Sequence, residues 1–263
     1  MTGRILTGML CAAGIAGLAC PPAAEADTIL YGVTWLGDFV QIDKSTGAAA
    51  VIGKVGYGSL NSMAVDSHGR LFASGNTANK LIEIDPTTGE GAVKVQFTGM
   101  PSGYNPRGLA FDADDNLYAV LSQQSLGEID LLARIDVETG AVTVIGETGR
   151  KDLQGLDFGP DGVLYGAAVY AGLASLDVES GAVVDIIGDD GFDPDDQTLE
   201  FDVDGTLYAA QYNLQIVDPF TGEGTVVGDL GTASSVRGLA IIPEPATLLM
   251  LVVLGGLAST RRR

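Results

Sequence analysis

Cysteine and histidine are almost absent from this chain of 263 residues, which has two cysteines, Cys11 and Cys20, and one histidine, His68. Beyond position 20 the sequence therefore excludes a disulfide framework, a cysteine nucleophile and a zinc site built from cysteine and histidine. His68 lies in a predicted tight turn, where a Ser-His-Asp triad is not expected. Stability must come from packing alone.

Positive charge is also scarce, with 14 Lys and Arg against 34 Asp and Glu and a net charge of −20 at pH 7. Residues 27–245 keep ten of the basic residues and 33 of the acidic ones, so their net charge is −23. A surface of this sign repels phosphate backbones and anionic headgroups. Nucleic acid is therefore excluded as a partner.

Residues 1–26 are predicted to be a secretory signal peptide, since a positive residue is followed by an apolar run and by Ala-Glu-Ala at 24–26. The mature chain would then begin at Asp27. A lipoprotein signal ending at Cys20 is the alternative. The residue three positions before that cysteine, Gly17, is not the large aliphatic residue such a signal favours.

The C-terminus combines three features in order: Pro243-Glu244-Pro245, an uncharged stretch at 246–260, and the arginines Arg261, Arg262 and Arg263. As a helix the uncharged stretch would span roughly 22 Å, which is short for a permanent anchor. Arginines after an apolar run stop translocation and stay in the cytoplasm.

These last 21 residues resemble a PEP-CTERM sorting signal. The resemblance implies processing by an exosortase, transient contact of residues 243–263 with the inner membrane, and delivery to the cell surface or extracellular polysaccharide matrix of a Gram-negative bacterium. An ordinary single-pass anchor is the alternative. The signal gives a location rather than an activity.

Between the two ends one unit recurs five times. Each copy has a short apolar strand, a turn rich in Asp and Gly, and a strand that opens with Leu and an aromatic residue, as in "RGLAFDADDNLYAVL". The first strands share an apolar position, at Met63, Leu109, Leu156, Leu199 and Leu239. Five hairpin turns of the pattern Asp-x-x-Thr/Ser-Gly recur with them: one that starts at Asp43, before Met63, and four between these positions, which start at Asp85, Asp136, Asp177 and Asp218.

Four strands in each unit of about 40–47 residues predict a β-propeller blade. The chain enters with "TILYGVT", a second strand without its first, and leaves with "RGLAII", a first strand without its followers. These fragments complete one blade, so the sequence predicts an all-β domain at 27–242, a five-bladed propeller closed by its N- and C-terminal strands. The repeat resembles the NHL/YVTN-like propellers across residues 28–242. It lacks the Gly-His and Trp-Asp marks of WD40 repeats.

Connections between the predicted strands divide into two faces. The uniform face carries the near-identical first-to-second turns, such as "DSHG" and "DVDG", and the Asp-x-x-Thr/Ser-Gly turns. The variable face carries the connections that differ between blades, and is the expected binding surface because repeats diverge where function requires it. It is expected to include the 189–196 run and Trp35, Tyr104, Glu128, Asp130, Arg150, Lys151 and Tyr170.

Five polar residues stand two positions before the apolar markers and are expected at the mouth of a central channel. These mouth residues are Asn61, Arg107, Gln154, Gln197 and Arg237. Their hydrogen-bond donors suit the hydroxyls or the carboxylate of a sugar. The alternative is that they only solvate a water-filled channel.

Asp157 and Glu200 occupy a position that is alanine in three other first strands. Two carboxylates on neighbouring strands are what a glycosidase requires, one as acid and one as base or nucleophile. This interpretation rests on analogy with other propellers. Charges that line the channel, or a cation site, are the alternatives.

Calcium is the one candidate ion, and no other cofactor is predicted. The run "DDGFDPDD" offers five carboxylates on a bent loop, those of Asp189, Asp190, Asp193, Asp195 and Asp196. A solvated acidic loop is the alternative. The Asp-x-Asp-Gly sequence at 202–205 lacks the rest of an EF-hand loop and is explained by turn chemistry.

The sequence therefore favours an exported, non-enzymatic module at the cell surface that binds polysaccharide or protein. A glycoside hydrolase or lyase using Asp157 and Glu200 is the alternative. A third interpretation is a structural protein whose acidic faces are cross-linked by calcium.

Overall fold

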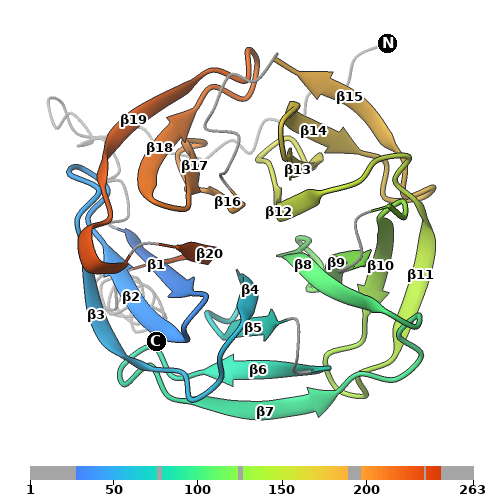
Figure 1. Cartoon of the computed structure of the whole chain (residues 1–263), viewed down its shortest axis with the longest axis horizontal. Helices are drawn as coiled ribbons and strands as arrows, with labels where there is room; N and C mark the ends of the chain where they lie inside the picture. Colours follow the sequence, from blue (N-terminus) through green and yellow to red (C-terminus); the bar gives the residue numbers. More distant parts are fainter. Residues whose placement is uncertain (1–27, 76–78, 124–126, 189–196, 234, 244–263) are drawn as a thin grey trace, which may run out of the picture.

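The computed structural model describes residues 28–75, 79–123, 127–188, 197–233 and 235–243. Within these ranges the chain forms twenty β-strands and one short 3-10 helix, at Gly231–Ala233. The strands make five four-stranded antiparallel sheets around a common axis (Figure 1). The prediction of an all-β, five-bladed propeller is confirmed.

Each blade runs from its innermost strand to the outer edge. Blade 1 contains β20 (Val236–Pro243), β1 (Thr28–Thr34), β2 (Asp38–Ile42) and β3 (Ala49–Lys54). Blade 2 contains β4 (Leu60–Val65), β5 (Leu71–Gly75), β6 (Lys80–Ile84) and β7 (Gly91–Gln96). Blade 3 contains β8 (Tyr104–Phe111), β9 (Leu117–Gln123), β10 (Leu131–Ile135) and β11 (Val142–Glu147). Blade 4 contains β12 (Leu153–Phe158), β13 (Leu164–Ala168), β14 (Gly172–Leu176) and β15 (Val183–Ile187). Blade 5 contains β16 (Leu199–Phe201), β17 (Leu207–Ala210), β18 (Asn213–Val217) and β19 (Gly224–Asp229).

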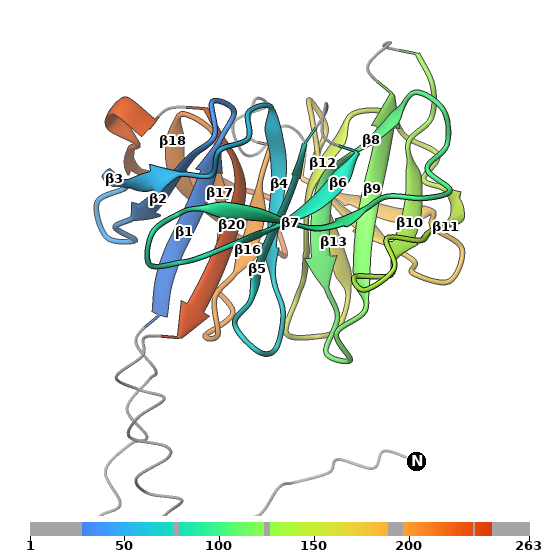
Figure 2. The ribbon, with the colours of Figure 1, turned by 90° about the horizontal axis from the view of Figure 1, so that it is seen from below.

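The ring closes in blade 1, where β20 pairs with β1 as predicted. Thr28 lies opposite Pro243 and Tyr31 opposite Ala240 in this antiparallel ladder. The start of β1 and the end of β20 therefore take the place that a first-to-second turn has in the other blades (Figure 2). Both ends of the propeller thus leave from the uniform face.

The Asp-x-x-Thr/Ser-Gly turns form as the sequence predicts. In the turn of blade 2, the Asp85 carboxylate accepts a hydrogen bond from the Thr87 amide at 2.7 Å, and Gly89 has a φ of 76°. This positive φ is favourable only for glycine. Equivalent bonds recur in the turns that begin at Asp43, Asp136, Asp177 and Asp218.

Each of these turns also packs on the outer strand of the preceding blade. At the closure, Gly47 of blade 1 lies on Gly228 of blade 5, so that a Cβ added to Gly228 would stand 2.0 Å from the Thr46 carbonyl oxygen. The outer strands are thereby tied into a continuous band. This contact explains the glycine near the end of β3, β11 and β19.

Aromatic residues near the start of the second strands pack against neighbouring blades. Phe72 lies 5.6 Å from Phe111, and Tyr118 lies 5.4 Å from Phe158, measured between ring centroids. Tyr165 and Phe201 make the next such contact. In blade 1, Tyr31 instead stacks on Phe39 of its own sheet.

The axis of the ring is closed rather than open. The five apolar markers of the first strands are at most 3% exposed, and the void that they line holds only about 10 Å³. That space is close to the size of one water molecule. A water-filled channel does not pass this level, so the mouth residues stand above an apolar floor.

Candidate functional site

Three mouth residues are placed by β-bulges on the innermost strands. In β4 the register skips Asn61 between Leu60 and Ser62, and in β8 and β20 it skips Arg107 and Arg237 in the same way. A bulge leaves one residue unpaired in the ladder and redirects its side chain. The bulges thus remove two arginines and an asparagine from the strand pairing at equivalent positions of three innermost strands.

All five mouth residues stand directly before a residue that lines the central void. Those lining residues are Ser62, Gly108, Gly155, Thr198 and Gly238. The innermost strands approach backbone to backbone here, because a Cβ on Gly238 would lie 2.4 Å from the Met63 nitrogen and one on Gly155 would lie 2.7 Å from the Thr198 Cα. The predicted ring of polar residues is therefore brought together around one narrow centre.

Hydrogen bonding at the mouth is incomplete. Among the residues that the structure describes, neither the buried Nε of Arg107 nor the buried Oε1 of Gln197 has a hydrogen-bond partner. Arg237 donates from Nε to the Ser235 hydroxyl at 3.3 Å, and its guanidinium lies 5.6 Å from the ring centroid of Trp35. Buried polar groups normally have partners, and atoms of Ser74, Arg150 and Gln211 elsewhere in the described residues lack one as well.

Asp130 lies beside this mouth and is 1% exposed. Its carboxylate accepts hydrogen bonds from the Ser122 hydroxyl at 2.5 Å and from the Leu153 amide at 2.7 Å. Burial raises the pKa of Asp130 to about 6, although these two bonds and nearby Arg107 act to lower it. The sequence placed Asp130 on the variable face but gave no signal of its burial, which depends on the neighbouring blade.

Asp157 and Glu200 lie on facing sides of neighbouring blades, nearer the uniform face. Asp157 accepts the Phe201 amide at 2.6 Å, and Glu200 accepts the Ile241 amide at 2.8 Å. Burial raises the pKa of Asp157 to about 7. Burial, followed by the Asp157 charge, raises the pKa of Glu200 well above its ordinary value. The two carboxyl groups are therefore neighbours, as the sequence suggested, and each is bonded to the backbone of the next blade.

The aspartates Asp189 to Asp196, the leader 1–26 and the tail from Glu244 onward lie outside the described residues. The calcium loop and the sorting signal consequently stay predictions. No helix in the described ranges is long and apolar enough to cross a membrane.

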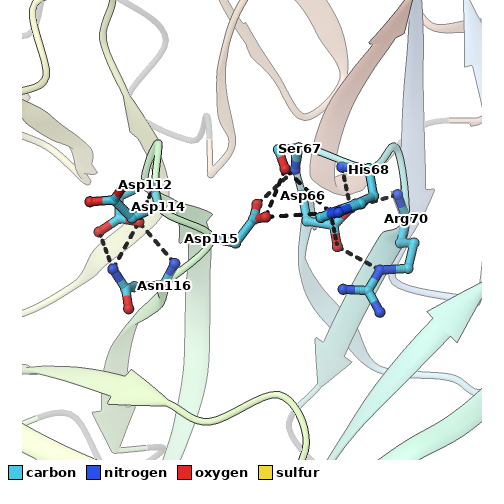
Figure 3. Close-up of polar contacts among 8 residues, drawn as sticks. All are labelled: Asp66, Ser67, His68, Arg70, Asp112, Asp114, Asp115 and Asn116. Carbon is cyan, nitrogen blue, oxygen red and sulfur yellow. Dashed lines mark hydrogen bonds and ion pairs between the residues drawn. The ribbon is translucent and has the colours of Figure 1, made fainter.

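A polar cluster that the sequence did not predict joins blades 2 and 3 on the uniform face (Figure 3). Asp115 reaches from the β8–β9 turn to Ser67, accepting its amide at 2.8 Å and its hydroxyl at 2.7 Å. His68 Nδ1 lies 3.4 Å from the same carboxylate, while Asp66 is paired with Arg70 at 2.6 Å. The Ser67 hydroxyl donates to Asp115 and also lies 3.3 Å from His68 Nδ1, the same nitrogen that faces the carboxylate. A triad needs the two ring nitrogens to contact the carboxylate and the serine separately, so this group lacks that arrangement.

Three open hollows lie on the uniform face or its rim. The largest, about 670 Å³, is lined by Asp66, Asp112, Asp114 and Tyr118 among others. Another of about 520 Å³ contains Arg134 and Asp136, and one of about 420 Å³ lies beside Thr28 and Lys44. None of the three is lined by Asp157 or Glu200.

No family model matches the chain, and no curated protein matches it. Solved structures do resemble it. A structure of a nidogen/laminin complex is 13% identical, with 82% of this chain and 98% of that chain covered and a TM-score of 0.57. A gluconolactonase from Xanthomonas campestris is 15% identical, with 84% of each chain covered and a TM-score of 0.50. Regucalcin from Agrobacterium tumefaciens, described as a calcium-binding protein, is 13% identical, with 84% and 75% covered and a TM-score of 0.51. At such identities the likeness shows that this chain shares the propeller fold.

Proposed function

We propose that this chain is an exported, non-enzymatic binding module that is displayed at the cell surface or in the extracellular matrix. Its ligand, a polysaccharide or a surface protein, binds at the mouth on the variable face. The observation that supports this proposal most directly is the pairing of Thr28 with Pro243. The tail is joined to the uniform face. The mouth lies at the other end of the innermost strands, so it points away from the tether.

The charge distribution supports the same orientation. The turns of the uniform face carry 16 Asp and Glu residues against two basic residues, within 43–48, 66–70, 85–90, 112–116, 136–141, 159–163, 177–182, 202–206 and 218–223. The mouth instead has two arginines and three amides. An anionic ligand is therefore repelled by the uniform face and attracted to the arginines of the mouth.

Co-sedimentation of the purified full-length protein with the producer's extracellular polysaccharide, in calcium-containing buffer, tests the binding. Replacing Arg107 and Arg237 with alanine should weaken it, whereas replacing Arg134, which lies in a hollow at the uniform face, should not. Loss of binding in the Arg134 variant alone would refute a ligand site at the mouth. A protein that binds neither polysaccharide nor surface proteins would refute the function.

The export route has its own test. Alanine at Pro243, Glu244 and Pro245, or removal of Arg261 to Arg263, should leave the protein in the inner membrane if an exosortase-type enzyme processes the tail. Cell fractionation with an antibody against the propeller measures this. Unchanged release to the surface would contradict the sorting assignment.

A hydrolase or lyase remains the second candidate, because Asp157 and Glu200 have the raised pKa values that acid–base catalysts use. The gluconolactonase of similar fold is also a hydrolase by name. Asp157→Asn and Glu200→Gln should then each abolish turnover of the polysaccharide. If reducing ends appear at the unaltered rate with both variants, these residues have no catalytic role.

Calcium is the proposed ion, held by Asp189, Asp190, Asp193, Asp195 and Asp196. The calcium-binding description of regucalcin supports testing it. Titration calorimetry should detect binding that disappears when the five aspartates are replaced by asparagine. Light scattering with and without calcium separates a cross-linking role from an isolated site.

A further inference from the structure

Arg107 has an unusual position for a cation in so acidic a chain. Within the described residues it forms no ion pair, whereas Arg70 is paired with Asp66. Its Nε is buried and has no hydrogen-bond partner there. The bulge in β8 takes Arg107 out of the pairing with β9. A guanidinium is suited to a planar acceptor that bonds two of its N–H groups at once.

The neighbouring mouth residues favour hydroxyl groups. Asn61 and Gln154, which are 3% and 6% exposed, and Gln197 carry amides, which donate and accept hydrogen bonds as sugar hydroxyls do. The buried Oε1 of Gln197 is an acceptor that has no donor among the described residues. Beside Arg237 stands Trp35, whose partly exposed ring offers an apolar face.

The floor limits how the ligand can bind. Because the void beneath the mouth holds about 10 Å³, no polymer can thread the axis. A chain must lie across the mouth and present a substituent to it. The substituent that fits a guanidinium fork among amides is a carboxylate carried on a hydroxylated ring.

We propose that the mouth binds a uronate residue of an acidic polysaccharide, with Arg107 holding the carboxylate and the amides of Asn61, Gln154 and Gln197 holding hydroxyls. This inference rests on the proposed function and names its ligand class. A neutral polysaccharide would leave the Arg107 fork without a partner. The acidic uniform face would repel the same polymer, so that only the mouth engages it.

Asp130 gives the site a pH dependence that a passive polar mouth would lack. Its carboxylate lies close enough to Arg107 to affect its own ionisation, and it also faces Asp152, Ser122 and the Leu153 amide. When Asp130 ionises above pH 6, it competes with the ligand for the Arg107 charge. Affinity should therefore rise about fivefold or more between pH 7.5 and pH 5, where sugar carboxylates are still ionised.

The single tryptophan provides the readout, since Trp35 lies beside Arg237 at the mouth. The full-length protein is titrated with oligomers of galacturonate, glucuronate and mannuronate, and with the same oligomers after reduction of their carboxyl groups. At least one acidic oligomer should bind roughly tenfold more tightly than its reduced form. Equal binding of acidic and reduced oligomers would overturn the uronate proposal but leave a sugar-binding module. No binding by any of them would also overturn the uronate proposal, whereas the proposed function is overturned only if the protein binds neither the producer's polysaccharide nor its surface proteins.

Single-residue variants distinguish a specific role of Arg107 in binding from a general effect of positive charge. Arg107→Ala should weaken uronate binding roughly ten- to 100-fold without affecting reduced oligomers, and Arg107→Lys should restore little because lysine lacks the fork. Arg134→Ala is the matched control and should bind normally. Asp130→Asn should bind at pH 7.5 as the unaltered protein does at pH 5. Equal effects at Arg107 and Arg134, or an unchanged pH profile in Asp130→Asn, would contradict the proposal.

Discussion

The carboxylate of Asp157 accepts a hydrogen bond from the Phe201 amide, 2.6 Å away, and so joins the innermost strands of blades 4 and 5. Glu200 makes the equivalent contact to Ile241 in blade 1, and Asp130 of blade 3 makes one to Leu153 in blade 4. The second strand of each blade pairs with one edge of the innermost strand, and the other edge, which faces the axis of the ring, has amides without a strand partner. Three side chains therefore supply acceptors that the sheets lack.

These buried carboxyl groups should make the propeller more stable in mild acid than at alkaline pH. Burial raises the pKa of Asp130 to about 6 and of Asp157 to about 7, above the ordinary value of 3.8. Their stabilising contribution is present below about pH 4 and is lost as the pH rises through 6 and 7. A rise of about two pKa units corresponds to roughly 3 kcal/mol. Thermal unfolding followed by circular dichroism should give a lower midpoint at pH 8 than at pH 5.

Glu200→Gln isolates one of these groups. Glutamine keeps an oxygen to accept the Ile241 amide but cannot ionise, so it resembles the protonated glutamic acid. The variant should unfold at a higher temperature than the unaltered protein at pH 8 and at the same temperature at pH 5. Destabilisation at pH 8 would show that the ionised carboxylate is favoured here, contrary to its raised pKa.

A further carboxylate, that of Asp202, joins the two blades that meet where the ring closes. Asp202 of blade 5 accepts the Thr28 hydroxyl at 2.8 Å and pairs with Lys44 at 2.6 Å, and its side chain is 6% exposed. Asp202→Ala should therefore cost about 1–3 kcal/mol of unfolding free energy, because it leaves a partly buried lysine without its partner. Urea unfolding measures this.

The matched control is the pair of Lys54 with Asp38, whose lysine side chain is 67% exposed. Lys54→Ala should cost under about 1 kcal/mol, as exposed ion pairs do. Similar losses in Asp202→Ala and Lys54→Ala would show that the Asp202 contact adds nothing to ring closure.

The blades and turns could be predicted because their signals are local. Asp85 and Gly89 belong to one short hairpin, and the fragments at Thr28 and Pro243 each lack strands that the other supplies. The bulge at Arg107 and the ties made by Asp130 and Glu200 could not be predicted in this way. They depend on the distance between backbones of different blades, which no spacing within one repeat reveals. The pairing of Asp115 with Ser67 was missed for the same reason.

The contact between each hairpin turn and the preceding outer strand gives the last prediction. In Gly228→Ala, the new methyl group would meet the Thr46 carbonyl oxygen at 2.0 Å, a backbone atom that can move only if the blade 1 turn leaves blade 5. Overpacking of this kind typically costs about 1–3 kcal/mol. Gly58→Ala is the control, since a Cβ there has no neighbour within 4 Å. Hydrogen exchange should show faster opening at the seam between blades 5 and 1 in Gly228→Ala only. Equal exchange in both variants would mean that the outer band does not hold the ring together, leaving the task to the innermost strands and their carboxylate ties.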